Sequence, residues 1–170
     1  VLYVDGEPRW EYRYLKNRLL RTESRFEREI DLSAWLTSAS REFEQESSPG
    51  ITALRRCPTE AEELLDNFDL VILGDVDPVR ISADPLDGQR FVEAVATFVE
   101  RGGGLLMLAG PKHNPAAYRG TRIESLLPIE IGREAARADQ PYLALPAIPT
   151  SPHPVTLLEA DPEVNQMLWE

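Results

Sequence analysis

The order of apolar and polar residues over the first two thirds of the chain predicts strands and helices in alternation. Residues 1–4 form a short apolar run that ends at an Asp-Gly pair, which is typical of a buried parallel strand. Tyr12, Leu15 and Leu19 then recur at helical spacing, so a helix with one apolar face is predicted there. Two further aromatic residues are expected to widen that face: Trp10 and Tyr14.

Three more strands are predicted farther along the chain. Residues 28–36 alternate between apolar and polar, which is the pattern of a half-buried strand near the edge of a sheet. The run 69–75 has a β-branched apolar centre bounded by Asp and Gly, as expected of a central strand. Residues 105–109 are apolar and follow three glycines, so they are predicted to form another buried strand.

Two helices are predicted between these strands. Thr59 and Glu62 have the spacing of a capping box, which predicts that a short helix begins at Thr59. A longer helix is predicted from about Asp87, because apolar residues recur there every three or four positions as far as Val99. The glycine run 102–104 is expected to end it.

Together these elements predict an α/β fold with a mostly parallel sheet and helices on both faces, a three-layer α/β/α sandwich. Residues 1–110 carry the regular α/β core. The remainder, 111–170, is rich in proline and is expected to complete the same domain, with a helix beginning near 161. The chain lacks an initiator Met and ends within that predicted helix. We therefore interpret residues 1–170 as a single domain excised from a longer protein.

Polar and charged side chains follow three of the predicted strands at their carboxyl ends, where open parallel sheets bind ligands. If these strands are parallel neighbours, the side chains meet at one edge of the sheet and form a candidate ligand site. The alternative is structural, since Asp, Gly and Asn are also common turn formers and helix caps. The candidate residues are Asp5, Glu7 and Arg9 after the first strand, Asp75 and Asp77 after the third, and Lys112, His113 and Asn114 after the fourth.

The charges of these candidate residues lead to two expectations. Carboxylates gathered without partners would repel one another. We therefore predict at least one contact between an acid of the first or third strand end and a base from Arg9, Lys112 or His113. A cavity beside that contact would suit a small ligand with a carboxylate or similar anionic group, held by Lys112 and Arg9.

Composition and charge exclude several functions. Eighteen Lys and Arg against 29 Asp and Glu give a net charge of -11, which argues against a nucleic-acid partner. One Cys and two His argue against a disulfide framework, a thiolate zinc cluster and a multi-histidine metal centre. No apolar run is long enough to cross a bilayer, so this segment is not expected to insert into a membrane. Neither a cofactor nor a metal is predicted.

Two catalytic chemistries can be compared with the predicted strand ends. A nucleophile elbow needs Ser or Cys at a strand-to-helix turn, and the corresponding turn, Ala109-Gly110-Pro111, has neither. Cys57 lies in a loop before a helix, with no His nearby in the sequence, and is expected to be inert and dispensable.

A magnesium site of the phospho-receiver kind is a further alternative. Asp5, Asp75 and Asp77 would supply the carboxylate oxygens that Mg²⁺ prefers, with Lys112 beside them. Receiver domains carry a second acid directly after the first strand, however, and here Asp5 is followed by glycine.

Three segments of the sequence resemble one bacterial family. They are VLYVDGEPRWEYRYLKN at 1–17, VILGDV at 71–76 and FVERGGGLLMLAGP at 98–111. The family is the group of class I glutamine amidotransferase-like domains embedded in large bacterial membrane proteins, often next to a von Willebrand factor A-type domain. The resemblance covers nearly the whole chain and implies a flavodoxin-like three-layer sandwich.

The resemblance does not extend to the catalytic residues. Amidotransferases place a catalytic Cys on the turn after the Gly-rich strand, and later a His and a Glu separated by one residue. Here that turn is Gly110-Pro111, and Pro115 and Val155 stand two residues after the two histidines. Without the nucleophile no glutaminyl thioester can form. The resemblance therefore implies a degenerate active site.

The function expected from these observations is a non-catalytic amidotransferase-like module that binds a small anionic ligand or other domains of the same longer chain. The resemblance implies a membrane-anchored parent protein, with this domain outside the bilayer and the extracytoplasmic side favoured. Relatives that resemble trehalose-utilisation proteins place a His near the same turn, which leaves a hydrolase as the alternative, using His113, Asp75 and Glu7. A structural spacer domain is the third interpretation.

Overall fold

The computed structural model describes residues 1–20, 30–40, 42–132, 146 and 153–169. The chain divides into two compact units, Val1–Arg133 and Glu134–Glu170. The first unit contains the sheet and all the candidate site residues. In the second unit α4, Pro162–Trp169, lies where the sequence predicts a helix, and the side-chain oxygen of Asn165 accepts the backbone N–H of Leu158 at 2.7 Å. The segment 141–157, predicted as extended, lies largely outside the described residues.

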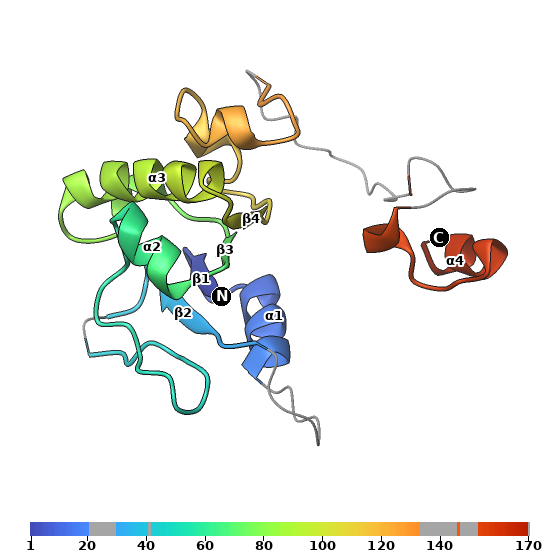
Figure 1. Ribbon diagram of the computed structural model, residues 1–170, viewed down its shortest axis with the longest axis horizontal. Helices are drawn as coiled ribbons and strands as arrows, with labels where there is room; N and C mark the ends of the chain where they lie inside the picture. Colours follow the sequence, from blue (N-terminus) through green and yellow to red (C-terminus); the bar gives the residue numbers. More distant parts are fainter. Residues whose placement is uncertain (21–29, 41, 133–145, 147–152, 170) are drawn as a thin grey trace. The chain divides into compact units, whose positions relative to one another are not determined.

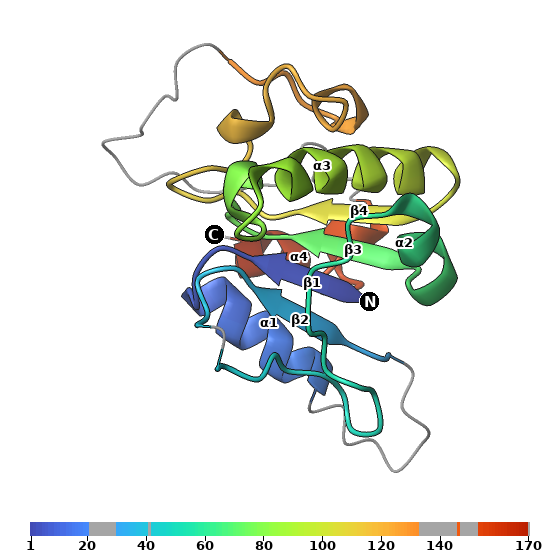
Figure 2. The same cartoon turned by 90° about the vertical axis from the view of Figure 1, so that its left-hand side faces the viewer.

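The first unit is built on a four-stranded, all-parallel sheet with the order β2-β1-β3-β4, so the protein has the predicted α/β fold (Figure 2). This order is that of the first four strands of flavodoxin-like sheets. The predictions of an edge strand within 28–36 and a central strand within 69–75 are confirmed, although both strands are shorter than predicted and residues 28 and 29 lie outside the described residues. The strands are β1 Leu2–Asp5, β2 Ser33–Leu36, β3 Leu70–Leu73 and β4 Gly104–Met107.

Helices lie on both faces of this sheet. Helix α1 (Trp10–Leu20) covers one face, and α2 (Ala61–Asn67) and α3 (Pro85–Glu100) cover the other (Figure 1). Because successive side chains of a strand point to opposite faces, neighbouring residues belong to different apolar clusters. Tyr3 packs on the α1 side, whereas Val4 packs on the side of α2 and α3.

The structure corrects three details of the sequence prediction. The strand predicted to be buried over 105–109 is β4, which is only half-buried, with Leu106 exposed. Helix α2 begins at Ala61 with Glu60 as its N-cap, and that N-cap makes no side-chain hydrogen bond, so the capping box predicted at Thr59 does not form. Trp10 and Tyr14 are each 77% exposed instead of widening the buried face of α1. Each is two positions from the buried Tyr12, which places it about 200° around the helix at roughly 100° per residue.

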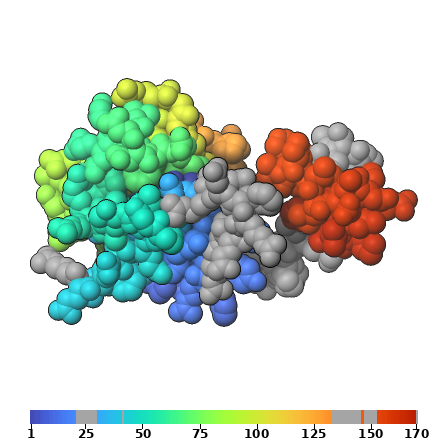
Figure 3. Space-filling view, turned by 60° about the horizontal axis from the view of Figure 1, so that its bottom comes forward, coloured from blue at the N-terminus to red at the C-terminus, as the bar shows by residue number. Residues whose placement is uncertain are grey.

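A long connection without a helix of its own joins β2 to α2. Its segment 45–48 covers the outer edge of β2. The Gln45 side chain accepts the Leu36 N–H at 2.8 Å and donates to the Leu36 carbonyl at 3.2 Å, and Ser48 Oγ accepts the Leu32 N–H at 3.0 Å. These bonds close a sheet edge that would otherwise offer free pairing groups. In the space-filling view the connection forms the cyan surface beside the green of α2 (Figure 3).

Within the described residues, no helix has both the length and the apolarity required to cross a membrane.

Candidate functional site

The parallel order of the strands brings the predicted site residues together. β1 and β3 are neighbours and β4 pairs with β3, so their carboxyl ends share one edge of the sheet. A cavity of about 200 Å³ opens there, and we call it the carboxyl-end cavity. It is lined by Gly6, Glu7, Arg9, Thr37, Ser38, Asp75, Asp77, Arg80, Pro111, Lys112 and His113.

Six of the eight candidate residues line this cavity, whereas Asp5 and Asn114 are buried and do not line it. The lining also includes Thr37, Ser38 and Arg80, which the sequence analysis did not single out. The rule that directs attention to strand ends could have found Thr37 and Ser38, since they directly follow β2. Arg80 follows β3 by seven residues, and no sequence signal separates it from other surface arginines.

Asp75 holds the loop that follows β4. Its buried carboxylate accepts three consecutive backbone N–H groups, from Lys112 at 3.0 Å, His113 at 2.7 Å and Asn114 at 2.8 Å. Burial opposes ionisation of this carboxyl, but the three donors and the nearby Arg9 guanidinium outweigh it and hold the pKa of Asp75 below its usual value. This geometry matches the structural alternative considered for Asp75.

Asn114 ties the ends of two strands together from inside the protein. Its side-chain amide donates to the carbonyls of Leu73 at 3.1 Å, Leu108 at 3.2 Å and Gly74. The carbonyls of Leu73 and Gly74 already accept backbone N–H groups at 2.8 Å, so the amide adds a second donor to each of them. Asn114 therefore positions the site and does not line it.

The fully buried carboxylate of Asp5 holds Arg9 against the sheet. It accepts the Gly6 N–H at 2.7 Å and the Tyr3 hydroxyl at 3.1 Å, and Arg9 Nε lies 3.4 Å away. Burial raises the pKa of Asp5, although Arg9 and the hydrogen bonds partly oppose that shift. This contact confirms the predicted pairing of an acid with a base at the strand ends.

Arg9 has unused hydrogen-bonding capacity. Its Nη1 donates to the Ala109 carbonyl at 3.2 Å, while the buried Nη2 has no hydrogen-bond partner among the described residues. A buried donor without a partner is costly unless a water or ligand satisfies it. Arg9 thus places a guanidinium with spare donor capacity at the wall of the carboxyl-end cavity.

The other acidic residues of the cavity are paired near the surface. Glu7 forms an ion pair with Lys112 at 2.6 Å, and both side chains are more than half exposed. Asp77 caps the short 3₁₀ helix Pro78–Arg80 by accepting the Val79 N–H at 3.0 Å, and Arg80 Nε lies 3.6 Å from it. Pairs this exposed contribute little to stability.

These pairings leave the cavity suited to an anion. Asp75 is surrounded by donors, Glu7 and Asp77 each face a base, and the His113 ring has no hydrogen bond to any described residue. The described residues do not support a metal site. In the described part of the chain, no three His, Cys, Asp or Glu side chains are grouped as a metal site requires.

Two glycines make room for these carboxylates: Gly74 directly after β3, and Gly110 on the turn after β4. A Cβ at Gly74 would overlap the carboxylate of Asp5, and a Cβ at Gly110 would overlap that of Asp75. Gly110 stands on the turn after β4, where the resemblance described above would place a catalytic Cys. In this protein the Asp75 carboxylate takes up the space that any side chain at position 110 would need.

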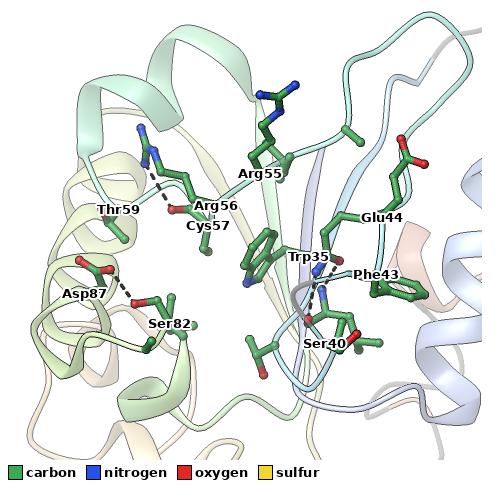
Figure 4. A pocket seen from close by; sticks show the side chains of 18 of the residues that line it. Trp35, Ser40, Phe43, Glu44, Arg55, Arg56, Cys57, Thr59, Ser82 and Asp87 are labelled. Atoms are coloured by element: carbon green, nitrogen blue, oxygen red, sulfur yellow. Dashed lines mark hydrogen bonds between the residues drawn. The ribbon is translucent and has the colours of Figure 1, made fainter.

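A second and larger cavity, of about 1060 Å³, lies beside Trp35 of β2, and we call it the Trp35 cavity (Figure 4). One wall carries Arg56 and Cys57, and the opposite wall carries Phe43 and Glu44. Two residues line both this cavity and the carboxyl-end cavity: Thr37 and Arg80.

Cys57 belongs to the apolar core at the wall of the Trp35 cavity. Burial raises the pKa of its thiol well above the usual value, as expected of an unreactive cysteine.

The burial of Cys57 changes the expectation that it is dispensable. We expect Cys57→Ser to lower the free energy of unfolding by about 1–3 kcal/mol, because it places a hydroxyl without a partner in the core. The control variant Cys57→Ala adds no polar atom, so it should lower the free energy of unfolding by less than Cys57→Ser does. Denaturant titration of both variants measures the difference, and a Ser variant as stable as the Ala variant would contradict the expectation.

Comparison with known proteins gives no match: no protein-family model, no curated protein and no solved structure is significantly similar to this chain.

Proposed function

We propose that this chain is a non-catalytic amidotransferase-like module that binds a small organic anion in the carboxyl-end cavity and belongs to a membrane-anchored protein. The resemblance of residues 1–17, 71–76 and 98–111 to that family supports the proposal, as does the flavodoxin-like strand order. From the same resemblance we propose that the module lies outside the bilayer, with the extracytoplasmic side favoured over the cytoplasmic side.

The observation that carries the non-catalytic part is the packing of Gly110 against Asp75. A side chain at position 110 would overlap the Asp75 carboxylate, which is itself held by three backbone N–H groups. A nucleophile at this turn would therefore require the loop after β4 to be rebuilt. Acyl transfer from glutamine needs such a nucleophile to form its covalent intermediate.

The anion-binding part is supported by the charges of the carboxyl-end cavity. Arg9, Arg80 and Lys112 line it together with Glu7, Asp75 and Asp77, so the formal charges of its lining cancel in a chain whose net charge is -11. The three carboxylates are engaged by donors or bases of the protein itself, so an anion meets less repulsion in this cavity than over the acidic surface elsewhere. Charge-assisted hydrogen bonds from guanidinium and ammonium groups suit a carboxylate. The volume of about 200 Å³ suits a small one.

For catalysis we expect no release of ammonia from glutamine above the buffer blank. Gly110→Cys, which restores the missing nucleophile in sequence, should also be inactive, because its side chain has no room beside Asp75. Ammonia release that disappears in the double variant Lys112→Ala/His113→Ala would overturn the non-catalytic assignment and favour the hydrolase alternative.

For binding we expect acetate to perturb the NMR signals of residues around the carboxyl-end cavity in a saturable way. Lys112→Ala/His113→Ala removes two of the cavity's donors and should weaken that binding by about tenfold or more. Arg101→Ala is the matched control, since it removes a positive charge whose ion pair is with Glu62, away from this cavity. Equal losses in both variants would show only a general charge effect and would overturn the proposed site.

A further inference from the structure

The Trp35 cavity exists because one part of the sheet lacks a covering helix. On the α2 and α3 side, α3 packs against β4 and α2 packs against α3, while the chain between β2 and α2 forms no helix until Ala61. The face of β2 that carries Trp35 is therefore bordered by a loop instead of a helix. A cavity of about 1060 Å³ is large enough for an organic molecule of ten or more heavy atoms.

The lining of the Trp35 cavity suits an apolar, planar group. Trp35 lies between the two walls, and the exposed Phe43 belongs to one of them (Figure 4). Leu54 and Ile81 add aliphatic surface. Aromatic rings bury a large area and stack on planar groups, which makes them the usual anchors of ligand cavities.

The charges divide the Trp35 cavity into a polar end and an apolar centre. Its acidic residues are the exposed Glu42, Glu44 and Glu60 and the half-buried Asp87, and Glu44 lies on the loop wall in Figure 4. Arg80 lies where the two cavities meet, with a highly exposed side chain whose only ion pair among described residues is 3.6 Å long. Arg55 and Arg56 also line the Trp35 cavity, but its four acids outnumber its three arginines, whereas the charges of the carboxyl-end lining cancel. An anion is therefore better placed in the carboxyl-end cavity, and an attached apolar group against Trp35.

We propose that the two cavities form one composite site for an amphipathic organic anion, whose anionic group lies in the carboxyl-end cavity and whose planar apolar body lies against Trp35. This inference rests on the proposed function, because it adds a planar apolar group to the anionic ligand proposed for the carboxyl-end cavity. Arg80 and Thr37 form the passage between the two parts. The ligand class is thus an aryl-substituted carboxylate or a close equivalent, larger than acetate.

Isothermal titration with three probes tests the composite site: acetate, 2-naphthylacetate and the uncharged 2-naphthaleneethanol. For the unmodified chain we expect 2-naphthylacetate to bind at least about tenfold more tightly than acetate, because its ring system leaves water. The alcohol should bind more weakly than 2-naphthylacetate, because it lacks the group that Arg9, Lys112 and His113 would hold.

Two variants separate the apolar part from the anionic part. Trp35→Ala should abolish the advantage of 2-naphthylacetate over acetate while leaving acetate binding unchanged. Ala83→Trp fills the cavity from an exposed lining position without removing a core side chain, so it should have the same effect if Trp35→Ala fails to fold. Tyr14→Ala, which removes an equally exposed aromatic ring on α1 that lines neither cavity, is the control and should change neither affinity.

The outcomes distinguish the two proposals. If acetate binds and 2-naphthylacetate binds no more tightly, the composite site is overturned and the proposed function stands. If the affinity for 2-naphthylacetate falls in Trp35→Ala but not in Lys112→Ala/His113→Ala, the anionic group does not lie in the carboxyl-end cavity. Both the composite site and the proposed function then fail. If Lys112→Ala/His113→Ala weakens the binding of acetate and of 2-naphthylacetate by the same factor, both the composite site and the proposed function are supported.

Discussion

Asp75→Asn should lower the free energy of unfolding by about 3–5 kcal/mol. The buried carboxylate accepts backbone N–H groups at 3.0, 2.7 and 2.8 Å, and hydrogen bonds to a charged acceptor are each worth about 1.5–3 kcal/mol. An amide has the same size but only one acceptor oxygen, so part of the loop after β4 would lose its partner. Urea denaturation of the purified chain measures the change.

Asp77→Asn is the matched control, because it makes the same chemical change two residues away. Asp77 lies at the surface, where it caps a single 3₁₀ turn and faces Arg80. We expect its replacement to cost about 1 kcal/mol or less. Equal losses for the two variants would show that the three backbone contacts of Asp75 do not stabilise the fold.

The effect of Asp75→Asn should depend on pH in a defined direction. The pKa of Asp75 is lower in the folded than in the unfolded chain. Ionisation of Asp75 therefore stabilises the fold fully above the unfolded pKa of about 3.9, and this stabilisation is lost as the pH falls through the lower folded pKa. The difference between the original chain and the variant should accordingly be largest near neutral pH and should shrink on acidification.

Asp5→Asn should lower the free energy of unfolding by about 2–4 kcal/mol. Asp5 is fully buried at the end of β1 and is the anionic partner of the largely buried Arg9. Removing one member of a buried ion pair leaves the other without compensation for its lost hydration. Glu7→Gln is the control: it breaks the exposed pair with Lys112 and should cost less than about 1 kcal/mol.

The pH dependence of Asp5→Asn should run opposite to that of Asp75→Asn. Burial raises the pKa of Asp5 in the folded chain. Protonation of Asp5 thus favours the fold, a contribution that is complete below the unfolded pKa and is lost as the pH rises through the folded pKa. The deficit of the Asn variant should grow on acidification. Parallel trends for the two variants would contradict the different environments assigned to Asp5 and Asp75.

These two carboxylates bear on the function as well as the stability. Both were candidates for ligand binding, yet each carboxylate is engaged by donors of the protein itself. Asp5 orients Arg9, and Asp75 orients the loop that presents Lys112 and His113. We therefore assign them to positioning the carboxyl-end cavity, and we leave ligand binding to the basic side chains that they hold.

The site was only partly predictable from the sequence. The rule that ligands bind at the carboxyl ends of parallel strands was sufficient to select Glu7, Arg9, Lys112 and His113, which lie at one cavity. The sequence could not separate them from Asp5 and Asn114, because burial depends on which strands become neighbours. It also gave no indication of the Trp35 cavity, whose lining combines separate segments between Trp35 and Asp87.

Local patterns by themselves determined the strands, most of the helices and the parallel character of the sheet. Apolar periodicity reflects which side of an element is buried, and that is encoded within ten or so neighbouring residues. Only the tertiary structure decided the partners of each charge, the role of Gly110 and the exposure of Trp10 and Tyr14. These depend on contacts between residues far apart in the chain, and a carboxylate acts as a ligand or as a cap according to the donors that those contacts bring to it.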